Sequence, residues 1–569
     1  MTHRPLEEPC LELTTSFVRY LGVSLCLLAC AANAGSGSDA SPKPSLIVAV
    51  SVDQFSAGLF DQYRARFTGG LKRMQDQGVI FPNGYQSHAA TETCPGHSTL
   101  LTGRHPSATG VISNNWYDTR AGRNVYCVED PTMTVPHRPK DPRGPGYLKV
   151  STLGEWMKQA NPASRNIAVS GKDRAAIMMS GHNPDAVFWW DAETGFNTYV
   201  PPGANETERL APVADFNAAL AKRWAKALPV WKPLDGRCAS LAGTQSYGDL
   251  TVHHQVPPPW KATDPAKGRN DPAFTSWFRA SPELDRLTLS LAGELFERYQ
   301  LGKGPAPDLL SISLSATDYV GHRYGNQSAE MCDQLAHLDH ELGLFFQKLD
   351  ASKVPYLVVL SADHGAVDAA EVVAQRAFAA QRLTDTLFPE INHQVRDALQ
   401  LELDPFKGGI TELYVSPEIT AAALRDRIVA TALSLLQQRP DVAAVFTKRE
   451  ILAVTVPKNK PADELTLLER FAESFDAERN GDLLIALQPY ATWGKASADY
   501  IAGHGSPWNY DRRVPILFWW PGAQGYEQYL PVETVDIAPT LAALIGVATP
   551  TVDGRCLDLD RGEGTTCLH

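Results

Sequence analysis

The sequence lacks the features that would place it in a membrane, nucleic-acid-binding or fibrous class. After residue 34, no run reaches the roughly 18 to 20 apolar residues that a membrane-spanning helix needs. The 52 basic residues are outnumbered by 64 acidic ones and form no cluster, which argues against nucleic-acid binding as the main task. No internal repeat is visible. With 44% hydrophobic and 20% charged residues, the 569-residue chain is predicted to be a large soluble globular protein.

The N-terminus contains a short apolar run, which we interpret as an export signal. A basic residue precedes the apolar stretch at 21–32, and Ala32-Asn33-Ala34 fits an Ala-x-Ala cleavage site. We expect residues 1–34 to be a signal peptide, residues 35–45 a linker, and the mature protein to be periplasmic or secreted. A membrane-anchored lipoprotein, lipidated at Cys30, is the alternative, and acidic residues upstream of the apolar run leave the true start codon open.

Cysteine is scarce, and no Cys-x-x-Cys pair occurs, so a structural zinc site built on thiolates is not expected. Six of the nine cysteines follow residue 34, and an even number in an exported protein suggests disulfides. Cys556 with Cys567 would close a short C-terminal loop, and Cys94 with Cys127 is a second candidate pair.

Five near-continuous apolar runs, separated by helical patterns, predict an α/β fold with a mainly parallel central sheet and helices on both faces. The runs begin at residues 46, 166, 309, 356 and 515. All but the last lead directly into Asp, Lys, Arg or His. Because ligands of such sheets bind beyond the carboxyl ends of the strands, a functional site is expected at that edge.

Segments rich in Pro and Gly, at 136–146 and 257–272, are predicted to run over the surface. Residues 46–569 are expected to form a single catalytic domain, with inserted accessory lobes near 185–300 and 366–500.

Three aspartates and three histidines stand out as metal ligands. Asp318 and His322 lie one turn apart if their segment is helical, and glycines flank His504. Each residue alone could be an ordinary turn or cap residue, but all six fall at predicted strand ends or loops. Mixed nitrogen and oxygen ligands favour zinc or manganese over magnesium or calcium. The candidate ligands are Asp53, Asp318, His322, Asp363, His364 and His504.

A candidate nucleophile lies in the segment Thr91-Glu-Thr93-Cys-Pro95-Gly-His, which is predicted to enter a helix. A hydroxyl at a helix N-terminus can meet a phosphate group, and metal coordination would lower its pKa and make it nucleophilic. The alternative is that Thr93 or Thr91 only caps the helix.

Taken in order, these motifs resemble the alkaline phosphatase superfamily, in the threonine-nucleophile branch related to type I phosphodiesterases/nucleotide pyrophosphatases. The carrying motifs are Thr-x-Thr-Cys-Pro-Gly-His, Asp-x3-His, Asp-His-Gly and Gly-His-Gly-Ser, together with the Asp that ends the first strand. The resemblance implies an alkaline-phosphatase-like core that holds two zinc ions per chain. One would be held by Asp318, His322 and His504, and the other by Asp53, Asp363 and His364, with Thr93 beside it.

Lys172 and Arg174 decide the substrate class that the resemblance implies. They match the Lys-x-Arg pair of the phosphate monoesterases, and Asn114 matches an Asn at the family spacing after the nucleophile. Two zinc ions, three aspartates and one alkoxide leave no net charge, so the Lys and Arg would balance a monoester dianion. The expected reaction is hydrolysis of small phosphate monoesters through a phospho-threonine at Thr93.

Three rival functions fit the sequence less well. A nucleotide phosphodiesterase would have an apolar pocket in place of the Lys-x-Arg pair. A sulfatase would carry Cys-x-Pro-x-Arg, which does not occur at Cys94. A non-catalytic exported binding protein would not need all six ligands and the nucleophile.

Overall fold

The computed structural model describes residues 43–376, 379–560 and 566–567, all within one unit of the chain, Ala40–His569. The predicted signal peptide, Cys30 and most of the predicted linker lie outside the described residues. None of the described helices combines the length and the apolar character that crossing a bilayer requires.

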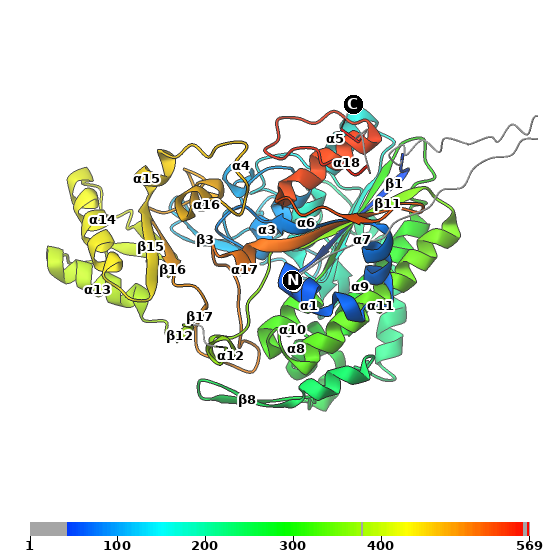
Figure 1. Cartoon of the computed structure of the whole chain (residues 1–569), viewed down its shortest axis with the longest axis horizontal. Coiled ribbons are helices and arrows are strands. Elements are labelled where there is room, and N and C mark those ends of the chain that lie inside the picture. The colour runs from blue at the N-terminus through cyan, green and yellow to red at the C-terminus, as the bar shows by residue number, and fades with distance from the viewer. Residues whose placement is uncertain (1–42, 377–378, 561–565, 568–569) are drawn as a thin grey trace, which may run out of the picture. The chain divides into compact units, whose positions relative to one another are not determined.

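A ten-stranded sheet forms the centre of this unit (Figure 1). Its middle strands are parallel to one another: β11 (Tyr356–Ser361), β1 (Leu46–Val52), β10 (Asp308–Leu314), β5 (Asn166–Ser170) and β6 (Ala186–Asp191). The other strands lie at the two sides. Next to β11 come β18 (Arg513–Trp519), β2 (Val79–Tyr85), β19 (Tyr526–Glu527) and β20 (Val532–Glu533), and next to β6 comes β7 (Gly195–Asn197).

The fifth predicted strand, β18, is present but runs antiparallel to both of its neighbours. A parallel neighbour needs a crossover of a dozen or more residues to bring the chain back to the opposite edge of the sheet. His504 stacks on His364 just beyond the carboxyl end of β11, and β18 begins only nine residues after His504, at Arg513. The chain therefore enters the sheet from that edge and runs back.

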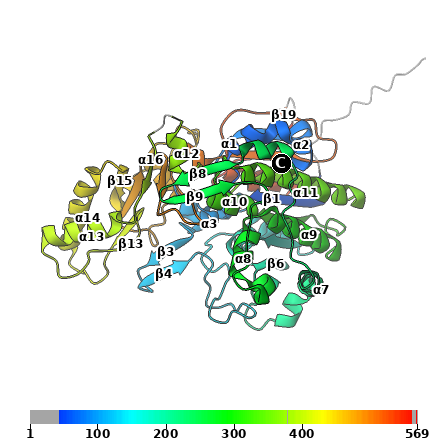
Figure 2. The ribbon, with the colours of Figure 1, turned by 90° about the horizontal axis from the view of Figure 1, so that it is seen from below.

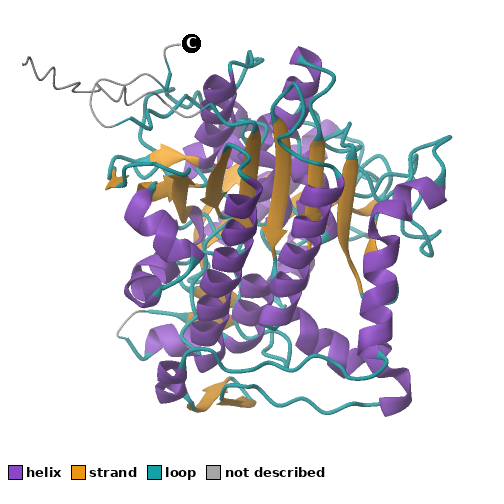
Figure 3. Ribbon diagram, turned by 90° about the vertical axis from the view of Figure 1, so that its right-hand side faces the viewer, coloured by secondary structure: helices purple, strands orange, loops and turns teal. Residues whose placement is uncertain are grey.

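The central strands are buried along their whole length, as the continuous apolar runs predict. Helices cover both faces of the sheet (Figures 1 and 3). Alternate residues of β1 belong to two different hydrophobic clusters. The first cluster contains residues of α2 (Gly70–Gln77), α9 (Pro282–Arg298) and α11 (Ala329–Ser352), and the second contains residues of α3 (Thr93–Leu100), α5 (Leu153–Ala160) and α18 (Ile537–Ile545). The predicted fold class, α/β with a mainly parallel sheet covered on both faces, is confirmed.

Several smaller sheets surround this core. A four-stranded sheet in the order β13 (Phe406–Gly408), β14 (Glu412–Val415), β16 (Leu483–Leu487), β15 (Val442–Thr447) packs with α13 (Leu387–Leu399) and α14 (Ala422–Gln437). We call residues 387–487 the four-stranded lobe. Figure 2 shows it beside the hairpin of β3 (Asn115–Asp118) and β4 (Arg123–Tyr126), which β13 contacts. The lobe falls inside the segment that was expected to be an insertion.

Three disulfides join the six described cysteines. Cys94–Cys127 and Cys556–Cys567 are the pairs expected from the sequence, and Cys238–Cys332 is the third.

Candidate active site

The fold brings together the ends of the strands that carry the candidate ligands. Asp53 follows β1, and Asp363 and His364 follow the neighbouring strand β11. His364 Nε2 lies 3.4 Å from Asp53 Oδ1 and 3.4 Å from Asp363 Oδ2. These three side chains offer ligand atoms that lie within 4.8 Å of one another, which is compact enough for one metal ion.

The other three candidate ligands lie beside them. Asp318 and His322 are on α10 (Ala316–Tyr324), which follows β10, and His322 Nε2 is 3.2 Å from Asp318 Oδ1. His504 approaches from a distant loop, with its Nε2 3.4 Å from the same oxygen. Its ring stacks on that of His364, with 3.6 Å between the ring centroids. All six candidate ligands are therefore gathered at one edge of the sheet.

Each of the three histidines is oriented by a backbone carbonyl at its Nδ1. These carbonyl oxygens belong to Ala502 for His322, Gly365 for His364 and Thr91 for His504, at 2.8, 3.0 and 2.9 Å. A carbonyl only accepts hydrogen bonds, so each Nδ1 carries the proton and each Nε2 keeps a lone pair that faces the aspartates. A ring N–H held by a backbone carbonyl opposite the ligand nitrogen is typical of histidines that bind metals.

The burial of these groups also fits a metal centre. Among the described residues, Asp53 Oδ1, Asp318 Oδ1, Asp363 Oδ2 and His364 Nε2 are buried and make no hydrogen bond. Leaving such atoms without partners costs free energy, which a cation would recover. Burial also lowers the pKa of His364 to about 3, which keeps its imidazole in the neutral form that coordinates metals.

Lys172 is the cation that already lies among the three aspartates. It is the N-cap residue of α6 (Asp173–Ser180), and its Nζ is 2.5 Å from Asp53 Oδ2 and 2.6 Å from Asp318 Oδ2. Burial disfavours its charge, but Asp318 and Asp53 together raise the pKa of Lys172 above its usual value. One ammonium cannot balance three buried carboxylates. Burial, with repulsion from the other two aspartates, raises the pKa of Asp53 well above its usual range.

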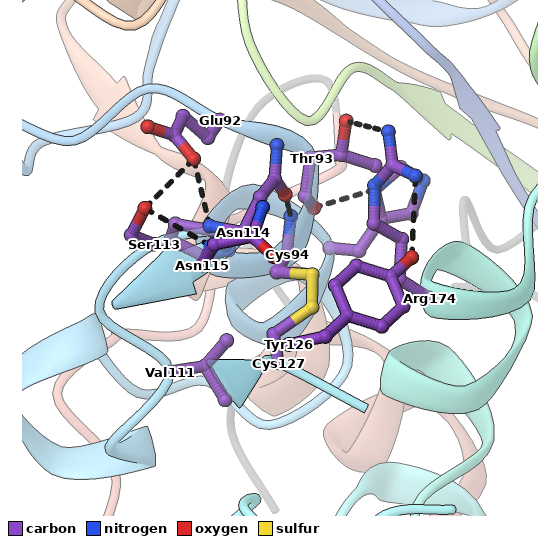
Figure 4. Close-up of a disulfide and its surroundings, with 12 residues drawn as sticks. Glu92, Thr93, Cys94, Val111, Ser113, Asn114, Asn115, Tyr126, Cys127 and Arg174 are labelled. Atoms are coloured by element: carbon purple, nitrogen blue, oxygen red, sulfur yellow. Dashed lines mark hydrogen bonds between the residues drawn. A yellow bond between two sulfur atoms is a disulfide. The ribbon is translucent and has the colours of Figure 1, made fainter. Parts of the chain in front are cut away.

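Thr93 lies at the start of α3, and Figure 4 shows it facing Arg174. Glu92 is the N-cap residue and makes no side-chain cap bond, and Thr91 Oγ1 donates to the Ser506 carbonyl. Neither threonine therefore acts as a helix cap, which was the alternative interpretation. Instead, Thr93 Oγ1 accepts a 3.3 Å hydrogen bond from Arg174 Nη2.

The Cys-Pro-Gly-His motif fixes α3 against the end of β11. A Cβ on Gly96 would lie 1.9 Å from the Asp363 carbonyl oxygen, so this close approach requires glycine. His97 Nδ1 is 2.9 Å from the Thr93 carbonyl and 3.1 Å from Asp363 Oδ2, and its Nε2 is 3.0 Å from Ser313 Oγ. His97 thus links the helix that carries Thr93 to Ser313 on β10 and lies against a candidate ligand. No local pattern in the sequence singled out this residue.

Asn114 is held beside the same helix. Its side-chain Oδ1 accepts from the Cys94 backbone N–H at 2.8 Å, and the backbone N–H of Asn114 donates to Glu92 Oε2 at 2.7 Å. The Cys94–Cys127 disulfide ties Cys94 to the end of the β3–β4 hairpin (Figure 4). Apart from its position next to Thr93, nothing in the sequence pattern singles out Glu92.

Tyr126 is a further residue that the sequence analysis missed. Its hydroxyl accepts from Arg174 Nη1 at 3.3 Å and donates to Asp173 Oδ1 at 2.7 Å. Arg174 therefore joins the hairpin to the Thr93 hydroxyl (Figure 4).

Comparisons with known proteins agree with this arrangement. The family model for type I phosphodiesterase / nucleotide pyrophosphatase matches residues 47–504. The chain is 44% identical over 547 residues to alkaline phosphatase PhoK of a Sphingomonas species, covering 93% of this chain and 94% of that protein. It is also 44% identical over 537 residues to alkaline phosphatase PhoD of Zymomonas mobilis, covering 92% and 89%. The crystal structure of alkaline phosphatase PafA superposes with a TM-score of 0.79 at 26% identity, covering 91% of this chain and 99% of that one.

Proposed function

Since the chain belongs to the type I phosphodiesterase/nucleotide pyrophosphatase family of the alkaline phosphatase superfamily and is a phosphoric monoester hydrolase, we propose that it is an exported two-zinc enzyme. It hydrolyses small phosphate monoesters through a phospho-threonine at Thr93. The observation that carries this proposal is the placement of Arg174 and Lys172 on two sides of one site. Arg174 contacts the Thr93 hydroxyl, and Lys172 contacts the aspartates.

The metal assignment rests on the donor set. Asp318, His322 and His504 would hold one zinc ion, and Asp53, Asp363 and His364 the other, with Thr93 beside the second. When bound, the zinc ions would supply positive charge at the nucleophile and at the leaving group. Manganese binds the same kinds of ligand, so the identity of the metal rests on the resemblance to the family.

The chain's own residues account for the handling of the phosphoryl group. Thr93 Oγ1 gives up its proton and forms a bond to phosphorus while the bond from phosphorus to the ester oxygen breaks. The ester oxygen takes up a proton and leaves as the alcohol from the opposite side. Water then attacks phosphorus, the bond from phosphorus to Oγ1 breaks, Thr93 regains its proton, and inorganic phosphate is released. Arg174 donates through its fork to the nonbridging oxygens, Lys172 adds a point charge, and the Asn114 amide is a further donor. Positive charge fixed in advance stabilises the charge on these oxygens.

Export is supported by the disulfides. The three bridges among the described cysteines are expected in an oxidising compartment such as the periplasm or the outside of the cell. A membrane-anchored lipoprotein would meet the same condition.

A phosphodiesterase activity is the second candidate, because the family description itself names phosphodiesterases. Lys172 and Arg174 favour the monoesterase. Their two positive charges match a phosphate dianion better than the single charge of a diester.

Trapping the intermediate tests the proposal. The zinc-loaded enzyme would be mixed with a phosphate monoester, quenched in acid and digested, and the peptides analysed by mass spectrometry. Phosphate on Thr93 is the expected result. Phosphate on another residue, or turnover with no phosphopeptide under conditions that trap one in a related alkaline phosphatase, would contradict it.

A further inference from the structure

A cavity of about 270 Å³ adjoins the active site between the four-stranded lobe and the loop that carries His504. The lobe contributes residues of β14 and β16, and the strand β17 (Ala491–Trp493) adds another wall. In Figure 1 the lobe is the yellow part of the ribbon that contains β15 and β16. On the opposite side, the cavity is lined by residues of the segment 89–92 just before Thr93, and by residues 503–507 around His504.

Apolar and aromatic side chains form much of this lining. They include Phe471, Leu484, Ile485, Leu487, Trp493 and Tyr500. Aliphatic and aromatic walls with a few polar groups are typical of pockets that bind the organic part of a small molecule. Aromatic rings add stacking and edge contacts with a flat ligand.

The cavity is acidic rather than basic. Glu92, Glu412 and Asp511 line it, and none of the described residues in its wall is Lys or Arg. A second cavity, of about 240 Å³, differs because its five basic residues outnumber its three acidic ones: Lys172, Arg174, Arg138, Arg143 and Arg279 line it together with Asp141, Asp173 and Asp191. Basic side chains are therefore in excess where the phosphoryl group is expected, whereas acidic side chains without basic ones line the apolar cavity.

The apolar cavity also lies on the side from which an alcohol would leave. His504 lines it, whereas Thr93, Lys172 and Arg174 do not. In an in-line displacement, the leaving oxygen departs opposite the nucleophile. On the proposed assignment, His504 belongs to the ligand set away from Thr93, so a leaving group that passes His504 enters this cavity.

We propose that this cavity binds the leaving group of the substrate and selects an uncharged, apolar alcohol, aromatic alcohols above all, over one that bears a second anionic group. This inference rests on the proposed monoesterase function. It narrows the substrate class from phosphate monoesters in general to monoesters whose alcohol carries no carboxylate or second phosphate.

The charge preference is tested with two substrates of nearly equal shape. The zinc-loaded enzyme should hydrolyse 4-carbamoylphenyl phosphate with a kcat/KM about tenfold above that for 4-carboxyphenyl phosphate. The acidic side chains of the cavity would repel the carboxylate of the second substrate but not the uncharged amide of the first. Thr411 lies exposed at the rim of the cavity. Thr411→Lys adds a positive charge there and should remove most of the preference. Thr207→Lys, at an exposed position on α7 (Glu206–Trp224), is the matched control and should leave the preference unchanged.

The apolar contact is tested separately at Trp493. Trp493→Ala should lower kcat/KM for 2-naphthyl phosphate by about tenfold and change it for ethyl phosphate by less than about twofold. Trp260 is also half-buried but packs against Phe274 and Trp277, outside the cavity. Trp260→Ala should leave kcat/KM for both substrates nearly unchanged. If Trp493→Ala does not fold, the exposed Thr411→Lys variant still decides the question.

The outcomes separate the two levels of the proposal. Equal kcat/KM values for the carbamoyl and carboxyl substrates would overturn the leaving-group inference, and so would a ratio of these values that Thr411→Lys leaves unchanged. Hydrolysis of ethyl phosphate in the same experiment would still support the monoesterase function. Failure of the wild-type enzyme to hydrolyse any of the four substrates would instead overturn the monoesterase function, and the inference with it.

Discussion

Arg174 Nη2 donates to Thr93 Oγ1 across 3.3 Å, so the guanidinium expected to hold the phosphate also touches the hydroxyl expected to attack it. A phosphoryl group transferred to Thr93 would form within reach of the same fork of donors. One pair of residues in contact therefore supplies both the proposed nucleophile and a proposed ligand of the phosphoryl oxygens.

The first prediction concerns the nucleophile. Thr93→Ala should lower kcat for phosphate monoesters by at least about 10³-fold and abolish the phospho-enzyme, because no hydroxyl remains to form the covalent intermediate. Thr93→Ser keeps the hydroxyl and should retain measurable turnover. Steady-state kinetics of both variants, with zinc content confirmed, makes the comparison. Unchanged turnover in Thr93→Ala would reject Thr93 as the nucleophile.

The second prediction concerns the metal centre. The purified protein should contain about two zinc ions per chain, and His504→Ala should retain about one, because it removes a ligand from only one of the two proposed sets. Elemental analysis of the dialysed protein measures this. The exposed His253 on β9 (Leu250–His254) supplies the control, and His253→Ala should keep both ions. The same zinc content in all three proteins would count against His504 as a ligand.

The third prediction is that loss of one disulfide lowers activity, whereas loss of another lowers mainly stability. Cys238–Cys332 closes 94 residues and Cys94–Cys127 closes 33. Loop entropy alone makes them worth about 5 and about 4 kcal/mol of stability. The shorter bridge joins α3 to the hairpin that carries Tyr126 and that Asn114 directly precedes. Replacing Cys94 and Cys127 by Ala should therefore reduce kcat/KM at temperatures where both double variants are still folded.

Replacing Cys238 and Cys332 by Ala should lower Tm by more and leave kcat/KM nearly unchanged. Thermal unfolding and kinetics on the two double variants, side by side, provide the measurement. Equal losses of activity in the two would show that the bridge beside Thr93 has no positioning role.

The fourth prediction concerns pH and a buried carboxyl outside the metal cluster. Asp285 on α9 accepts from the Ala316 N–H and from Gln334 Nε2, and burial raises its pKa to about 7. In the unfolded chain its pKa is near 3.8. At pH values between these two pKa values, the Asp285 carboxyl is protonated in the folded protein and ionised in the unfolded chain. The contribution of this group to stability therefore falls as pH rises from about 4 to about 7, by up to about 4 kcal/mol.

Asp285→Asn should remove this dependence, because an amide carries no proton to lose. Its N–H would face Gln334 Nε2, and a turn of the Gln334 amide presents the unbonded Oε1 as the acceptor. Compared with the wild type, the free energy of unfolding of this variant should be higher at pH 8 and little changed at pH 4. Asp426→Asn, at an exposed position on α14, should show no such difference. A variant less stable than the wild type at pH 8 would contradict the expected sign.

Much of this arrangement could be predicted from the sequence because parallel strands deliver their carboxyl ends to one edge. Asp53, Asp318 and Asp363 each follow an apolar run, so strand register alone brings them together. The direction of β18 could not be predicted in the same way, because its apolar run is buried on both faces whichever way the strand runs. The short distance in sequence from His504 to Arg513 was the available clue.

Other features depend on contacts that no local pattern encodes. Cys238 and Cys332 are 94 residues apart, and nothing in the sequence around them indicates that they pair. Glu92 acts through the backbone of Asn114, and Tyr126 through the guanidinium of Arg174. Such positioning residues need only a hydrogen-bonding group at the right place, so no spacing rule identifies them.

The most direct test of the central claim compares matched aryl phosphate monoester and diester substrates on the zinc-loaded enzyme and on Arg174→Ala. The wild type should prefer the monoester strongly, and the variant should lose most of that preference, because one of the two positive charges that match the dianion is gone. Arg120→Ala, at a largely exposed arginine, should behave like the wild type. A wild-type preference for the diester, or a preference for the monoester that Arg174→Ala leaves intact, would contradict the proposed phosphate monoesterase.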